Sequence, residues 1–124
     1  MDFISTKKAP QAIGPYSQAV KAGNFLYISG QLPIDPATGI MASDISEATG
    51  HSLNNLISIV EEAGGKKENI VKVNVFMKDM AQFPQMNKVY EETFAGHKPA
   101  RAAVEVARLP KDAVVEIEAV AFIE

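Results

Sequence analysis

Cysteine is absent from the 124-residue chain, and histidine occurs only twice. The lack of thiols excludes disulfides, cysteine nucleophiles, iron–sulfur clusters and zinc sites with cysteine ligands. His51 and His97 stand alone, without the paired spacing of a metal site, so we expect both to be structural or exposed and we expect no metal. Any chemistry must come from oxygen and nitrogen groups.

Long apolar runs are also missing. No stretch approaches the roughly 20 residues that span a bilayer. In the N-terminal segment Met1–Lys8 the positive charges follow the apolar residues, and the apolar core of a signal peptide is lacking. We therefore expect a soluble, cytoplasmic protein with no membrane partner.

Charge of one sign is not concentrated either. The chain has 12 basic and 15 acidic residues, a formal net charge of −3, and Lys66-Lys67 as its densest basic run. This distribution offers no footprint for a phosphate backbone, so no nucleic-acid partner is expected. The composition, 47% hydrophobic and 22% charged, is typical of globular proteins. The length fits one domain over residues 1–124.

Turn residues and apolar periodicity divide the first half of the chain. Two extended segments within Tyr16–Ile28 flank Ala22-Gly23-Asn24 at hairpin-loop length and predict a β-hairpin. A helix is expected to start at Asp44, which with Glu47 forms a D-x-x-E capping box, and to end at Gly64-Gly65. Helical spacing gives this helix an apolar stripe of Leu53, Leu56, Ile57 and Val60.

The second half contains three strands and one helix. Alternation over Ile70–Met77 predicts a strand, with Val71, Val73, Val75 and Met77 on one face. A second helix is expected from about Phe83, with a proline in its first turn, to Gly96. Its apolar stripe consists of Met86, Val89, Tyr90, Thr93 and Phe94. Two final strands lie near Ala100–Ala107 and Val114–Ile123.

The resulting order is β-β-α-β-α-β-β, with room for a short strand at the N-terminus. This order predicts an α+β fold with two helices packed on one face of a mixed β-sheet, because each apolar stripe must find an apolar partner.

The other face of the sheet needs a separate explanation. Charged residues alternate there with bulky apolar ones: Arg101, Ala103, Glu105 and Ala107 on one strand, and Glu116, Glu118, Val120 and Phe122 on another. One interpretation is a solvated face. The apolar residues, with Phe76, favour instead a subunit interface that embeds polar groups, and hence a homo-oligomer. In that interpretation Arg101 lies on the interface face.

The chemical signal lies in separated segments, because no Walker loop, GxSxG elbow or HExxH motif occurs. The strings IGPYSQA at 13–19, SGQ at 29–31, KPARAAVEVARLPKDA at 98–113 and EIEAVA at 116–121, together with Asn87, resemble the RidA/YjgF family in order and spacing. The resemblance runs nearly from end to end of the chain.

This resemblance implies a homotrimer of chorismate-mutase-like, barrel-shaped architecture, with active sites in the clefts between subunits. It also implies hydrolytic deamination of reactive 2-imino acids and enamines, such as 2-iminopropanoate and 2-iminobutanoate, to 2-keto acids and ammonia. Members of the family need no cofactor, and the expected partner is the small-molecule 2-imino acid.

Two residues match the family's central positions. Arg101 matches the substrate-binding arginine, whose planar fork can hold a carboxylate through two parallel hydrogen bonds; the alternative is an ion pair with Glu105 or Glu118. Glu116 matches the residue thought to hold or activate the attacking water, and by family analogy it lies near Arg101. Glu118 shares its face, and an ion-paired or solvated role for Glu116 is the alternative.

Five further positions complete the expected substrate site. Tyr16 offers a hydroxyl or a ring, Ser29 and Gly30 offer a hydroxyl and a close backbone at a strand end, and Asn87 offers an amide. Their alternatives are an ordinary hairpin aromatic for Tyr16 and a surface amide for Asn87. Ala103 stands where many relatives carry cysteine, which excludes thiol chemistry and enlarges the pocket slightly.

Two other functions share parts of this site. A non-catalytic, keto-acid-binding regulatory trimer would use Arg101 without Glu116. A ribonuclease or translation-inhibitor function has been assigned to some relatives of this family. The acidic character of this chain gives that function little support.

Overall fold

The computed structural model describes residues 1–124 and contains one six-stranded sheet. The elements are β1 (Asp2–Ile4), β2 (Ala19–Ala22), β3 (Phe25–Gln31), α1 (Ile45–Glu62), β4 (Ile70–Met77), α2 (Phe83–Phe94), β5 (Ala100–Glu105) and β6 (Val115–Phe122). The strand order is β1-β2-β3-β6-β4-β5; β4 and β5 are parallel and every other pair is antiparallel. The predicted element order and the short N-terminal strand are confirmed.

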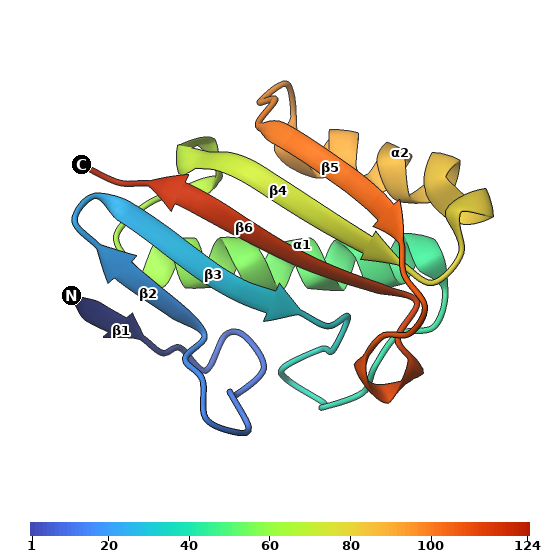
Figure 1. Ribbon diagram of the computed structural model, residues 1–124, viewed down its shortest axis with the longest axis horizontal. Coiled ribbons are helices and arrows are strands. Elements are labelled where there is room, and N and C mark those ends of the chain that lie inside the picture. The colour runs from blue at the N-terminus through green and yellow to red at the C-terminus, as the bar shows by residue number, and fades with distance from the viewer.

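Both helices cover the same face of the sheet, as Figure 1 shows, and the opposite face is bare. The predicted α+β architecture is therefore confirmed. The core lies between the two layers, where α1 contributes Leu53, Leu56, Ile59 and Val60 and α2 contributes Met86, Tyr90 and Phe94. Each such side chain removed from water contributes roughly 1.5 to 3 kcal/mol. No helix has the length and apolar character of a membrane span.

The start of α1 follows the predicted cap only in part. Asp44 is the N-cap, and its carboxylate accepts a hydrogen bond from the backbone N–H of Glu47 at 3.0 Å. The reciprocal bond of a capping box is absent, because the Glu47 carboxylate lies instead 3.6 Å from the ring of His51, one turn along the helix. The predicted stripe also needs one change, since Ile59 is fully buried and Ile57 only half-buried.

The predicted face of β4 is wrong at one residue. Val73, Val75 and Met77 are buried against the helices as expected, but Val71 is 43% exposed and Ile70 is buried in its place. A register irregularity between Ile70 and Lys72, where β4 pairs with β6, accounts for this. A bulge adds one residue and shifts the alternation.

The predicted ends of the last elements are also corrected. Strand β5 stops at Glu105 rather than Ala107, because its partner β4 ends at Met77 and the bond from the Val106 N–H to the Met77 carbonyl is the last between the two strands. Helix α2 ends at Phe94, and Ala95 takes the left-handed conformation with φ of 49° before the expected Gly96.

Candidate active site

Arg101 lies on β5, at the edge of the sheet, and faces α2. In the parallel register it pairs with Val73, whose side chain is buried under the helices. Its Nη1 donates a hydrogen bond to Asn87 Oδ1 at 2.7 Å. Its guanidinium carbon lies 4.7 Å from the ring centroid of Tyr90 and 5.4 Å from that of Phe83. We call Arg101, Asn87, Tyr90 and Phe83 the arginine cluster.

The guanidinium has no acidic partner in the chain. Glu105, one expected alternative partner, accepts the backbone N–H of Met80, and Glu118, the other, accepts from Asn74. Arg101 is exposed and borders a cleft of about 540 Å³. The cleft is also lined by Asn87, Tyr90, Glu91, Phe94, Gly96, His97, Lys98 and Pro99. The free N–H groups of the Arg101 guanidinium can therefore hold an anion from outside the chain.

Glu116 lies on β6 and points away from the helices. It pairs with Phe76, whereas its buried neighbours Val115 and Ile117 point toward them. Burial raises the pKa of the half-buried Glu116 carboxyl, and the negative charge of Glu118 on the same face raises it further. A carboxyl with a raised pKa is suited to take up and release a proton.

Gly30 lies directly against Glu116. A Cβ built on Gly30 would come within 2.9 Å of the carboxyl carbon of Glu116. The pairing of β3 with β6 is irregular between Ile28 and Gln31, so Ser29 and Gly30 occupy a bulge beside the carboxylate. We call Glu116, Gly30 and Ser29 the glutamate cluster.

Ser29 ties the loop that carries Tyr16 to this cluster. Its Oγ donates to the carbonyl of Ser17 at 2.6 Å, and its N–H bonds to the carbonyl of Gln18 at 2.9 Å. Tyr16 immediately precedes Ser17 in this loop and is 53% exposed, so its ring and hydroxyl are open to a ligand.

The two clusters lie on opposite faces of the sheet, and here the prediction from alternation is wrong. Arg101 shares its face with Val73, next to the helices, while Glu116 shares its face with Phe76, on the bare side. Arg101 therefore does not lie on the bare face predicted as the interface, and one chain does not bring it beside Glu116. Asn87 contacts Arg101, and Gly30 contacts Glu116. The half-buried Ala103 lies two residues from Arg101, and its side chain packs against the core.

The sequence pattern does not single out two contact residues of Arg101, Tyr90 and Phe83. In the sequence, Tyr90 fits the apolar stripe of α2 and Phe83 fits its start. Together with Asn87 they stand at i, i+4 and i+7, which places them on one face of a helix. That spacing, together with Arg101 on the strand that follows α2, is the feature of the sequence that indicates these contacts.

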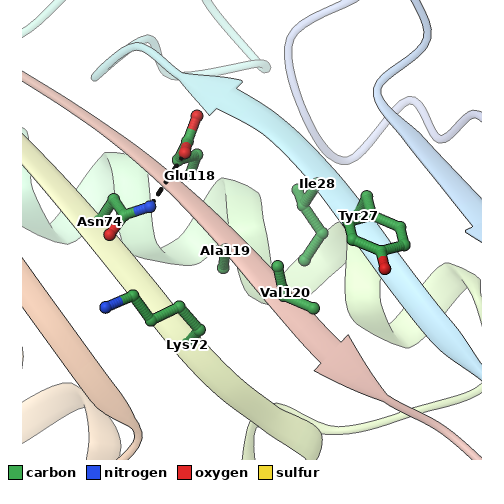
Figure 2. A pocket seen from close by; sticks show the side chains of 7 residues that line it. All are labelled: Tyr27, Ile28, Lys72, Asn74, Glu118, Ala119 and Val120. Atoms are coloured by element: carbon green, nitrogen blue, oxygen red, sulfur yellow. Dashed lines mark hydrogen bonds between the residues drawn. The ribbon is translucent and has the colours of Figure 1, made fainter.

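A second, smaller cavity lies on the bare face. It measures about 190 Å³ and is lined by Tyr27, Ile28, Lys72, Asn74, Glu118, Ala119 and Val120. Figure 2 shows Asn74 of β4 reaching across to Glu118 of β6, with a hydrogen bond of 3.0 Å between them. The cavity holds none of the predicted site residues.

The two histidines lie outside both clusters. The His97 ring hydrogen-bonds the carbonyl of Ile70 at 2.7 Å, and the His51 ring lies 3.6 Å from Glu47.

Gly30→Ala is expected to displace the Glu116 carboxylate, because the new methyl group would overlap it. Since φ of Gly30 is not positive, the substitution does not strain the backbone itself. We expect a fall of at least tenfold in any turnover that depends on Glu116, with little change in melting temperature.

Gly23→Ala is not a suitable control, because Gly23 has φ of +60°. Ala119→Gly on β6 tests whether any small change nearby has the same effect. Full activity of Gly30→Ala would show that the carboxylate position is unimportant.

The fold and the site define a small α+β protein with an exposed arginine cluster on one face of its sheet and a glutamate cluster on the other. Comparison with known proteins identifies the protein family to which the chain belongs. A family model described as Endoribonuclease L-PSP matches residues 6–123. A Salmonella typhimurium protein named 2-iminobutanoate/2-iminopropanoate deaminase is 51% identical, over 95% of this chain and 94% of its own.

Solved structures of the same fold support the family indicated by the sequence comparisons. The YjgF gene product of E. coli superposes with a TM-score of 0.97 at 47% identity, and E. coli TdcF with bound serine superposes with a TM-score of 0.96 at 42% identity. In both cases the comparison covers 100% of each chain. The chain belongs to the RidA/YjgF family.

Proposed function

We propose that this protein hydrolyses reactive 2-imino acids, such as 2-iminopropanoate and 2-iminobutanoate, to 2-keto acids and ammonia. The relative from Salmonella typhimurium named as a deaminase of these two compounds supports the reaction, at 51% identity. The observation that carries the proposal is that the chain has both an exposed arginine without an acidic partner, held by Asn87, and a carboxyl of raised pKa against Gly30. An anionic, hydrolysable substrate needs both groups.

In the proposed reaction, Arg101 binds the substrate carboxylate through two parallel hydrogen bonds and fixes the imine carbon. Glu116 accepts a proton from water as the water oxygen bonds to that carbon and the C=N π bond becomes a lone pair on nitrogen. With the imine nitrogen protonated at the start, the carboxyl then returns its proton to the amine nitrogen. The C–N bond breaks and its electron pair leaves on ammonia, while the hydroxyl gives its proton to the Glu116 carboxylate and its O–H electrons form the carbonyl π bond. Tyr16, Ser29 and the Gly30 backbone border the substrate, and the alanine at 103 leaves room beside it.

The site is proposed to form between two copies of the chain, in a homotrimer. The two clusters lie on opposite faces of one sheet, so a substrate can meet both only where two chains adjoin. The bare face also carries an apolar surface that a partner would cover. Its aromatic part consists of Phe25, Tyr27, Phe76 and Phe122, of which Phe25 and Tyr27 are exposed. Such a surface is typical of subunit contacts.

A coupled assay tests the reaction. An amino-acid oxidase acting on alanine generates 2-iminopropanoate, and the rate of pyruvate formation is followed with and without micromolar protein. The proposal predicts faster imine loss with the protein present, whereas an unchanged rate would refute it. Repeating the assay with imines from several amino acids ranks the accepted side chains.

The alternative is a trimer that binds a 2-keto acid without turnover. It is favoured by one observation, namely that the arginine cluster is complete within a single chain while Glu116 is not part of it. Pyruvate binding that depends on Arg101, in a protein without deaminase activity, would support this alternative. RNA cleavage, which the description of the family model names, would have to be lost in Arg101→Ala to be assigned to this site.

A further inference from the structure

Arg101 rests on one face of α2. Phe83, Asn87 and Tyr90, spaced by four and then three residues, are its three contacts. Asn87 fixes one nitrogen at 2.7 Å, but a single hydrogen bond leaves the guanidinium plane free to rotate about it. The ring of Tyr90, 4.7 Å away, supplies the surface that can set this plane.

The Tyr90 ring is itself closely packed. Tyr90 is only 7% exposed, and its ring packs at 4.7 Å between centroids against Phe94, which is fully buried. Arg101, by contrast, is exposed on an edge strand. An exposed arginine samples many rotamers, and holding it in one of them costs conformational entropy at each binding event. A fixed aromatic platform reduces that cost in advance.

We propose that Tyr90 is a positioning residue, whose ring orients the Arg101 guanidinium for a carboxylate ligand. The assignment of that ligand rests on the function proposed above. The orientation itself rests on the contacts of the arginine cluster alone.

The hydroxyl of Tyr90 takes no part in this role. It is buried and has no hydrogen-bond partner within the chain. Burial raises the pKa of Tyr90, and the nearby charge of Arg101 only partly offsets this, so the phenol stays neutral. An unpartnered buried hydroxyl costs stability rather than adding it. The ring therefore carries the effect, and phenylalanine should replace tyrosine without loss.

Two variants of Tyr90 test the proposal. Tyr90→Met replaces the ring with a smaller, flexible apolar chain, whereas Tyr90→Phe removes only the hydroxyl. We expect Tyr90→Met to raise KM for 2-iminopropanoate and Kd for pyruvate about tenfold, with a smaller effect on kcat. Tyr90→Phe should keep wild-type values. Equal losses in both variants, or none in Tyr90→Met, would overturn the proposal.

A double-mutant comparison separates positioning from a general structural effect. In an Arg101→Ala background, Tyr90→Met should cause no further fall in the residual kcat/KM for 2-iminopropanoate, because the group that it orients is gone. An additional tenfold loss there would show that Tyr90 acts otherwise, and would overturn the proposal.

A measurement on the unliganded protein makes the test independent of activity and of folding of the variant. The side-chain N–H signals of Arg101 in the wild-type NMR spectrum should be shifted upfield by the Tyr90 ring current. Their absence from that position would overturn the proposal. A wild-type protein with these shifted signals but no turnover would contradict the deaminase function and leave the positioning of Arg101 supported.

Discussion

Replacing Arg101 with alanine is expected to lower kcat/KM for 2-iminopropanoate by roughly 100-fold or more, and to abolish measurable pyruvate binding. The guanidinium has no acidic partner to lose, and it lies exposed at the cleft beside Asn87. Its removal therefore deletes the carboxylate anchor without breaking an ion pair of the fold. Steady-state kinetics of imine loss, together with calorimetric titration of pyruvate, measures the effect.

Two controls sharpen this result. Arg101→Lys keeps the charge but not the planar fork, so it should restore only part of the affinity. Arg108→Ala removes the other arginine of the chain, which is exposed and outside the cleft, and should have little effect. Unchanged activity in Arg101→Ala would overturn the site assignment.

Replacing Glu116 with glutamine is expected to remove turnover, by about 10² to 10⁴, while pyruvate still binds. Glutamine has nearly the same shape, so it fits the space against Gly30, but it can neither accept the proton of water nor return it. The measurement is the split between kcat and pyruvate Kd. Loss of binding and turnover together would indicate a structural role for Glu116.

Glu118→Gln is the matched control on the same face. Its amide oxygen can still accept the hydrogen bond from Asn74, so the local structure should persist. Removing the charge of Glu118 removes a cause of the raised pKa of Glu116. Activity that needs the Glu116 carboxylate falls as pH drops through that pKa, so in Glu118→Gln this decline should move to lower pH. A decline that stays at its wild-type pH would contradict the coupling.

The layers of the fold could be predicted from the sequence because its apolar periodicity is strong. The helix that begins after Asp44 and the alternation of Val115, Ile117 and Ala119 in the last strand each have one physically acceptable orientation. The position of Val71 could not be predicted in the same way. A bulge depends on how β4 pairs with β6, and that pairing is not encoded in β4 alone.

The face of Arg101 was mispredicted for a similar reason. Strand β5 carries small or apolar residues at both alternating positions, with Ala102 and Val104 on one side and Ala103 on the other. Alternation therefore separates its two faces without telling which one meets the helices. Only the register with β4 and the contact with Tyr90 decide this, and both are long-range properties.

Mixing two inactive variants tests most directly whether the site is shared between chains. Arg101→Ala and Glu116→Gln proteins are unfolded together, refolded at equal amounts and assayed for imine hydrolysis, with each variant refolded alone as the baseline. In a ring of randomly mixed subunits, about a quarter of the interfaces would join an intact arginine cluster to an intact glutamate cluster. If the site is shared between chains, about a quarter of wild-type activity is expected to return. Mixed oligomers that remain as inactive as the separate variants would contradict it.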